Sequence, residues 1–248
     1  MNHQITRHRH ELRRRQLTVK ETAHVTPNMI RILFAGDDLT DFVSLGADDH
    51  VKLFFPNGAG ESERRDYTPR RFDRETRTLA IDFAIHDAGP ATRWALAAKP
   101  GNVLEIGGPR GSTIVSPTFD WWLLVGDETA LPAIGRRIEE LPAGTRVISV
   151  VAVADSGDEQ TFTTRANHAA KWVYRPLDRA DDPEPVLSAL KALSLPEGDG
   201  YVWIAAEARL ARATRDYLVN ERGHPLQWTK ASGYWLKGIA DAHDKLKD

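Results

Sequence analysis

Hydrophobic residues follow two different patterns along the chain, and the change falls near Pro117. From Leu17 to about Pro117 they mostly recur at every second position, as in Ile30, Ile32 and Phe34. Alternation of this kind is typical of half-buried strands. Turn-like segments at 34–39, 56–62 and 98–102 separate these runs, so we predict a small antiparallel barrel or sandwich. One helix is expected within it, from Gly89-Pro90 to Lys99-Pro100-Gly101.

Beyond Pro117 the hydrophobic residues form short continuous runs, at 121–125, 147–154, 172–174 and 201–206. Runs of this length are typical of parallel strands buried on both faces. Between them lie segments with helical spacing, at 131–141, 186–193 and 208–222, the last ending at Gly223. We therefore expect an α/β domain with a parallel sheet. The predicted organisation is a lead-in at 1–16, a barrel domain at 17–117, and an α/β domain with a C-terminal tail at 118–248.

Charge and composition narrow the possible functions. The 248 residues carry a formal net charge of -2, so a general affinity for nucleic acid or anionic membranes is not expected. The Arg- and His-rich lead-in can be interpreted as a nucleic-acid arm or a transit peptide, but its shortness favours a solvated, partly disordered segment. No apolar run approaches the roughly 20 residues of a membrane helix, and no signal-peptide core is present, so we expect a cytoplasmic protein. Cysteine is absent, which leaves electron transfer to a bound organic cofactor.

The segment Arg64 to Arg71 offers the first candidate chemistry. Arg65 can hold a phosphate, Tyr67 can lie against a flat aromatic ring, and Thr68 can hydrogen-bond a ring nitrogen. A flavin needs these contacts. The alternative interpretation is a charged hairpin edge with Tyr67 as a rim aromatic.

Two strand-to-helix turns offer anion sites. At the first, Ile85 leads through His86 into Gly89, Pro90, Ala91 and Thr92, where unpaired helix N–H groups suit a pyrophosphate. The second, Val125 to Pro132, lies where parallel sheets bind ligands; its alternative is an ordinary helix start capped by Asp127 or Thr129. Zinc spacing, a serine-hydrolase elbow, a G-x-G-x-x-G fingerprint and a Walker loop are all missing from the sequence.

Several segments together resemble the siderophore-interacting proteins. They are R-x-Y-T at 65–68 followed by Pro-Arg-Arg at 69–71, IDFAIH at 81–86, GPATRWA at 89–95, GGPRGS at 107–112, GDETALPAI at 126–134 and ASGYWLKG at 231–238. The resemblance implies an N-terminal FAD-binding antiparallel barrel and a C-terminal NAD(P)H-binding α/β domain, as in the ferredoxin-reductase superfamily. It implies hydride transfer from NADH or NADPH to FAD, then single-electron reduction of a ferric siderophore.

The same resemblance assigns residues to each ligand. It implies FAD contacts from Arg65, Tyr67, Thr68, His86, Gly89, Pro90, Ala91 and Thr92. It implies a nicotinamide crevice lined by Gly126, Asp127, Glu128, Thr129, Ala130 and Glu207. Ala206 stands where the family often has glycine, which weakens the case for close approach there. Trp235 and the cations Lys52, Arg70, Arg71, Lys230 and Lys237 are candidates to contact an anionic ferric siderophore.

Several questions remain open at the level of sequence. Asp155 favours NADH, whereas Arg165 and Arg175 favour a 2′-phosphate and hence NADPH; ferredoxin is a further possible donor. The alternative functions are a flavin reductase acting on free flavin or a protein partner, and a siderophore-binding module without turnover. We expect a monomer by default. Whether Trp228, Tyr234 and Trp235 cover the flavin is not decided.

Overall fold

The computed structural model describes residues 3–56, 62–85 and 89–239, which fall into two compact units. One unit holds residues 4–116 with 135–137, and the other holds residues 117–134 and 138–239 with His3. Each unit is considered by itself. Within the described residues, no helix is long and apolar enough to cross a membrane.

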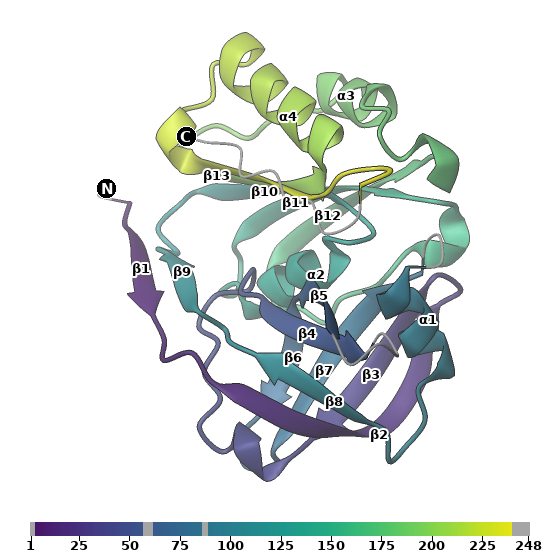
Figure 1. Ribbon diagram of the computed structural model, residues 1–248. Helices are drawn as coiled ribbons and strands as arrows, with labels where there is room; N and C mark the ends of the chain where they lie inside the picture. The colour runs from purple at the N-terminus through teal and green to yellow at the C-terminus, as the bar shows by residue number, and fades with distance from the viewer. Residues whose placement is uncertain (1–2, 57–61, 86–88, 240–248) are drawn as a thin grey trace. The chain divides into compact units, whose positions relative to one another are not determined.

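The first unit is built on a seven-stranded antiparallel sheet (Figure 1). Its order is β5-β4-β8-β2-β3-β7-β6. The outer strands, β5 and β6, follow one another in the chain, so the sheet curls round as the barrel prediction requires. The strands are β2 (Arg14–Thr26), β3 (Met29–Ala35), β4 (Val51–Pro56), β5 (Ser62–Tyr67), β6 (Pro69–Asp73), β7 (Thr78–Ala84) and β8 (Val103–Gly107).

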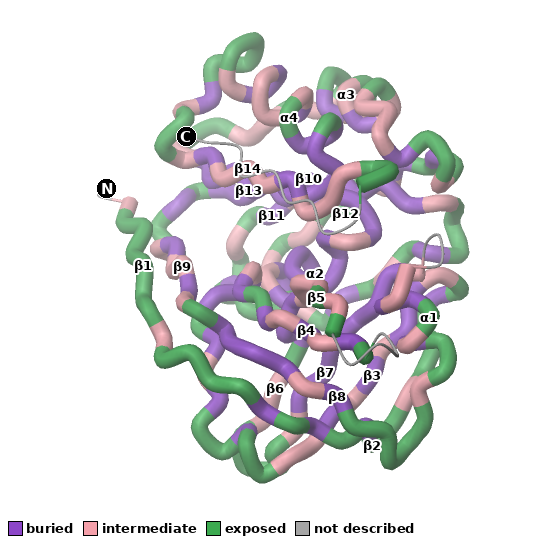
Figure 2. Tube along the Cα trace, viewed as in Figure 1, coloured by how far each residue is buried: buried purple, intermediate pink, exposed green. Residues whose placement is uncertain are grey.

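The predicted alternation places the core of this unit. Ile30, Ile32 and Phe34 of β3 are buried, whereas the residues between them are partly exposed, so one face of the strand packs inward. Figure 2 shows the same change of burial along neighbouring strands. Helix α1 (Pro90–Ala97) contacts β3, β4 and β7 and adds Ala91 and Ala95 to the core. The helix begins and ends where the sequence predicts.

A two-stranded sheet corrects the expected lead-in. Residues 5–9 form β1 (Ile5–Arg9), which pairs antiparallel with β9 (Gly111–Val115). All five β1 residues are exposed, so no hydrophobic alternation marks the strand in the sequence. The strand is instead held by backbone pairing with β9. The long strand β2 already begins at Arg14. The stretch 1–16 is therefore not a disordered lead-in over its described residues.

The second unit contains a five-stranded parallel sheet, as predicted. Its order is β12-β11-β10-β13-β14. Every residue of β10 and β13 is buried, which explains their continuous apolar runs. The elements are β10 (Trp121–Asp127), α2 (Leu131–Glu140), β11 (Arg146–Val153), β12 (Asn167–Tyr174), α3 (Glu184–Lys191), β13 (Gly200–Glu207), α4 (Ala208–Asp216) and β14 (Thr229–Trp235).

Helices α3 and α4 lie side by side on one face of this sheet (Figure 1). Trp121 and Trp122 are buried, consistent with the expected packing role. Gly223 has a left-handed φ of 69°, as a cap after the α4 segment requires. Short helical turns complete the fold: η1 (Asp37–Leu39), η2 (Ser156–Asp158), η3 (Leu177–Arg179), η4 (Tyr217–Glu221) and η5 (Leu226–Trp228).

Candidate functional site

The R-x-Y-T segment lies where β5 turns into β6. Tyr67 pairs with Val51 of β4, and its ring centroid lies 4.5 Å from that of Phe83. Burial raises the pKa of the Tyr67 phenol, and the nearby Arg65 cation lowers it to a smaller extent. The phenol therefore stays neutral at physiological pH. Thr68, between the two strands, is buried.

Arg65 lies two residues before Tyr67 and on the same face of β5, because side chains alternate along a strand. Its side chain is 21% exposed, and Nη2 lies 3.2 Å from Glu63 Oε2. Its Nη1 donates to the Arg64 carbonyl at 2.7 Å. A partly exposed guanidinium thus lies beside the aromatic ring of Tyr67.

The N-terminus of α1 contributes a second polar feature in the same unit. Gly89 is the N-cap and Pro90 the first helical residue, and within the described residues no side chain caps the helix. The first N–H groups of a helix have no acceptor within the helix, so they can donate to a bound anion. Ala91 and Thr92 are buried. His86, also expected here, lies outside the described residues.

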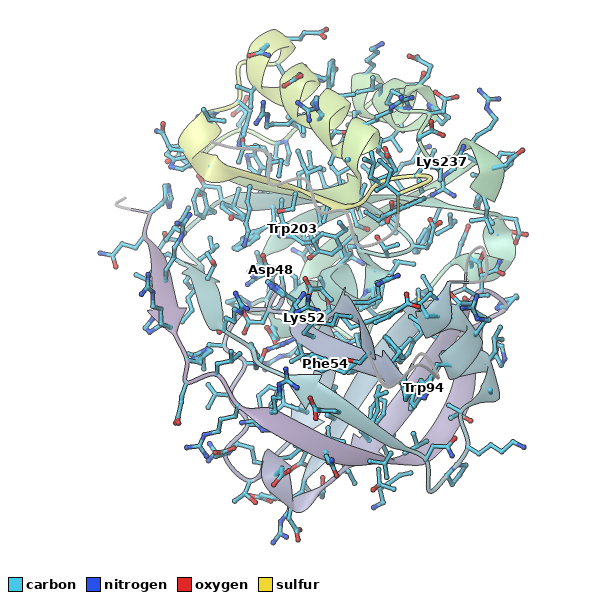
Figure 3. All side chains as sticks on the ribbon, in the orientation of Figure 1. Asp48, Lys52, Phe54, Trp94, Trp203 and Lys237 are labelled. Atoms are coloured by element: carbon cyan, nitrogen blue, oxygen red, sulfur yellow. The ribbon has the colours of Figure 1, made fainter. Side chains whose placement is uncertain are left out.

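Trp94 was not among the candidate site residues named from the sequence, although it lies only one helical turn beyond Pro90. Its ring centroid is 5.7 Å from that of Phe55 and 6.2 Å from that of Phe83. Figure 3 shows Trp94 on α1. Together with Tyr67 these rings form an aromatic cluster between α1 and the sheet. The helical spacing between Pro90 and Trp94 could have indicated that Trp94 lies near the start of the helix.

The residues of this unit fit FAD. A flavin requires an aromatic surface for its ring system, and its pyrophosphate requires a cation or unpaired N–H groups. Tyr67 supplies the surface, Arg65 the cation, and the uncapped start of α1 the N–H groups. The individual contacts stay predictions.

The candidate substrate cations of this unit have different surroundings. Lys52 Nζ lies 2.7 Å from Asp66 Oδ1 and the lysine is partly exposed (Figure 3). Arg70 is buried, with Nε 3.9 Å from Asp82 Oδ2, whereas Arg71 is exposed. Arg71 and Lys52 are thus the more accessible of the three to an anion in solution.

In the second unit, Asp127 ties together the carboxyl end of the sheet. Its Oδ1 accepts from the Thr129 N–H at 2.9 Å, which closes a turn before α2 begins at Leu131. Its Oδ2 accepts from the Glu207 N–H at 2.8 Å and from Trp235 Nε1 at 2.9 Å. The carboxylate therefore joins the ends of β10, β13 and β14. Asp127 and Glu207 are fully buried, so both shape this edge from within.

Gly126 allows β10 to approach its neighbours closely. A Cβ at this position would lie 2.7 Å from the Ala130 Cβ and 2.8 Å from the Ala205 carbonyl oxygen. Neither atom can move without shifting backbone. The glycine is therefore required by packing, whatever binds at the turn.

Glu128 forms a buried ion pair with Arg175. Arg175 Nη2 lies 2.6 Å from Glu128 Oε2, and the side chains are 3% and 8% exposed. Burial and the adjacent Asp127 charge raise the pKa of Glu128 to about 7, while Arg175 acts in the opposite direction. Arg175 follows β12 directly, and its N–H donates to Val153 O at the end of β11. The pair thus spans the ends of three neighbouring strands.

The C-terminal segment also reaches this edge. Glu207 Oε2 accepts from the N–H groups of Arg209 and Leu210, which caps α4, and Lys237 N lies 3.4 Å from Glu207 Oε1. Lys237 Nζ lies 2.7 Å from Asp181 Oδ1 (Figure 3). The structure thus brings Trp235 and Lys237 to the edge that holds Asp127 and Glu207.

The remaining residues of the C-terminal group pack elsewhere in the unit. The Trp228 ring meets the His3 ring edge-on at 5.1 Å, and Tyr234 meets Trp203 at 6.1 Å. Lys230 is half-buried on β14. The siderophore contact expected of Lys230 stays a prediction.

Comparisons with known proteins agree with this division of the chain. The family model described as siderophore-interacting protein matches residues 119–238. The model described as siderophore-interacting FAD-binding domain matches residues 18–64 and 59–113. Both models fall on the segments where the sequence predicts the two domains.

Relatives of known name span nearly the whole chain. An NADPH-dependent ferric-chelate reductase of Escherichia coli is 33% identical, over 92% of this chain and 94% of its own. A ferric vibriobactin reductase of Vibrio cholerae is 30% identical, over 87% and 86%. The crystal structure of a siderophore utilization protein from T. fusca is 35% identical and superposes with a TM-score of 0.90, over 98% of this chain and 99% of its own. The chain belongs to the siderophore-interacting protein family, with its FAD-binding domain followed by its α/β domain.

Proposed function

We propose that the protein is a ferric-siderophore reductase, which passes electrons from a nicotinamide nucleotide through FAD to ferric iron held in a siderophore. The observation that carries the proposal is the grouping of Tyr67, Arg65 and the uncapped α1 start in one unit. Its support from known proteins is the pair of reductase names among the relatives.

The chemistry of the reaction is supplied by FAD, which accepts a hydride and can release its two electrons singly. One NAD(P)H therefore reduces two ferric ions. The protein side chains bind and orient, and no acid or base is needed for reduction of iron itself. Arg65 and the α1 N-terminus would hold phosphate, and Tyr67 and Thr68 would hold the ring system. The ferrous ion binds its chelate more weakly, which allows release.

The nicotinamide nucleotide is proposed to bind at the carboxyl edge of β10 and β13. Open parallel sheets bind ligands at this edge. Gly126 to Ala130 and Glu207 lie there, with Trp235 and Lys237 added by the C-terminal segment. Ferredoxin as donor is the remaining alternative.

Siderophore binding is proposed to use exposed cations, because ferric siderophores are often anionic. Arg71 is the best placed candidate of the first unit, since Arg70 is buried beside Asp82. Arg71→Glu should weaken binding of an anionic ferric siderophore at low salt and leave FAD affinity unchanged. Lys99→Glu, an equal charge change at an exposed lysine of the same unit, is the control. Equal affinity in Arg71→Glu and Lys99→Glu would reject the role of Arg71.

The test of function compares electron acceptors. FAD-loaded protein is given NADH or NADPH with a ferric siderophore, a ferredoxin or free flavin, and turnover is followed. Ferric siderophore should be the preferred acceptor. Preference for free flavin or ferredoxin would favour the other reductases, and a protein that cannot be loaded with FAD would favour a binding module. We further propose that the protein is cytoplasmic, because NAD(P)H is supplied inside cells. We also propose a monomer, which size-exclusion chromatography tests.

A further inference from the structure

The ends of β11 and β12 carry an acidic surface in the second unit. Asp155 follows β11 by two residues and is exposed. Its Oδ1 accepts from the Gly157 N–H at 2.7 Å, so its own turn, η2, fixes the carboxylate. In dinucleotide-binding folds, an acidic side chain after the second strand accepts from the ribose hydroxyls.

Glu159 and Tyr174 extend this surface. The Tyr174 hydroxyl, at the end of β12, donates to Glu159 Oε1. The pKa of Tyr174 is raised first by this bond, then by burial and by the charges of Glu159 and Asp155. Asp155, Glu159 and Tyr174 therefore lie within electrostatic reach of one another. We call these three residues the β11–β12 acidic surface.

Arg165, one of the two cations that the sequence offered for a 2′-phosphate, lies at the opposite edge of the sheet. It precedes β12, and its carbonyl accepts from the Gly144 N–H just before β11. The amino-terminal edge lies a strand length from the ligand edge. Arg165 is therefore too far away to contact a nucleotide bound at the carboxyl ends.

Four described cations near the carboxyl ends have carboxylate partners. Arg175 is 3% exposed and points to Glu128. Arg179 pairs with Asp182, and both Arg209 and Lys237 pair with Asp181. The charge that a 2′-phosphate would meet at the ends of β11 and β12 is thus negative.

We propose that the β11–β12 acidic surface selects NADH against NADPH, with Asp155 accepting from the adenosine ribose hydroxyls. This inference rests on the proposed nucleotide site. Like charges brought together on binding cost several kcal/mol, so the discrimination should be at least about tenfold. It separates this chain from the Escherichia coli relative, whose name specifies NADPH.

Arg175 could itself bind a 2′-phosphate, although its Nη2 is paired with Glu128. Its Nε and Nη1 are buried without a hydrogen-bond partner among the described residues. Because these two atoms are buried, a phosphate could reach them only if the surrounding side chains moved. Arg175→Met therefore distinguishes the two possibilities, because it should leave NADPH use unchanged if the acidic surface sets the preference.

The experiment measures binding and reduction separately. Calorimetry with 5′-AMP and 2′,5′-ADP reports nucleotide binding without turnover, and stopped-flow mixing with NADH or NADPH reports reduction of bound FAD. The wild type should bind 5′-AMP more tightly and react faster with NADH, by about tenfold or more. Asp155→Asn with Glu159→Gln should bring both ratios towards one. Glu197→Gln, an exposed change before β13 at the opposite edge, should not.

Three results would overturn the inference. Tighter binding of 2′,5′-ADP or faster reduction by NADPH in the wild type would show that the acidic surface does not discriminate. Loss of NADPH use in Arg175→Met would assign the phosphate to Arg175. If neither mononucleotide binds and both nicotinamides are inert while reduced FAD still reduces ferric siderophore, the nucleotide site itself is wrong, and the reductase proposal stands with another donor.

Discussion

At the scale of single residues, Glu128 gives the clearest pH prediction. Its pKa in the folded protein is about 7, above the ordinary value of 4.5, because it is buried beside Asp127. Between pH 4.5 and about 7, Glu128 is therefore protonated in the folded state and ionised in the unfolded state. The free energy of unfolding falls as the pH rises through this range. Glu128→Gln should remove this fall, which amounts to at most about 3.5 kcal/mol at about 1.4 kcal/mol per pKa unit.

Urea unfolding at pH 5 and pH 8 measures this effect. The wild type should lose more stability than Glu128→Gln between the two pH values, and exposed Glu197→Gln should behave as the wild type. The same pH dependence in all three proteins would show that Glu128 titrates normally.

Arg65 gives a second prediction at this scale, with its neighbour as a matched control. A charge-assisted hydrogen bond contributes about 1.5–3 kcal/mol, so Arg65→Ala should weaken FAD binding by roughly tenfold or more. Arg64 is exposed and points to the other face of β5, so Arg64→Ala should have little effect. Titration of the apoprotein with FAD, followed by flavin fluorescence, measures both. Equal FAD affinities of Arg65→Ala and Arg64→Ala would show that Arg65 does not bind the flavin.

At the scale of elements, Asp127 should be needed to hold β14 and the end of β13 to β10. Asp127→Ala leaves the Glu207 N–H and the Trp235 indole N–H without their buried acceptor. Losing a buried partner of this kind costs about 1–3 kcal/mol per group. We expect a loss of about 3 kcal/mol in denaturant unfolding. A loss below about 0.5 kcal/mol would mean that other groups join these strands.

The elements that the sequence predicted are those whose burial sets their pattern. β3 and β4 alternate because one face packs, and β10 and β13 are continuously apolar because both faces do. Helix α1 was found through Pro90 and the Lys99-Pro100 stop.

The elements that were missed have no such pattern. β1 is exposed throughout and depends on pairing with β9. β14 is rich in small and polar residues, and the part of β12 before the predicted run at 172–174 is mostly exposed. Both are placed by neighbouring strands. Long-range partners, such as Arg175 for Glu128 and Trp235 for Asp127, are likewise invisible to local spacing.

At the scale of the whole molecule, two units have separate tasks. The first supplies the aromatic ring, the cation and the helix start that fit FAD. The second supplies the sheet edge proposed to bind the nicotinamide nucleotide. We expect its acidic surface to repel a 2′-phosphate. Their order along the chain matches that of the family.

Electron transfer from reduced FAD to a ferric siderophore is the step that defines a ferric-siderophore reductase, and it can be measured without a nicotinamide nucleotide. FAD-loaded protein is reduced anaerobically with dithionite, freed of excess reductant, and mixed with ferric siderophore and a ferrous chelator. We predict that the flavin absorbance returns while the ferrous complex forms, with two ferrous ions for each flavin. A flavin that stays reduced, with no ferrous complex above the protein-free control, would contradict the account.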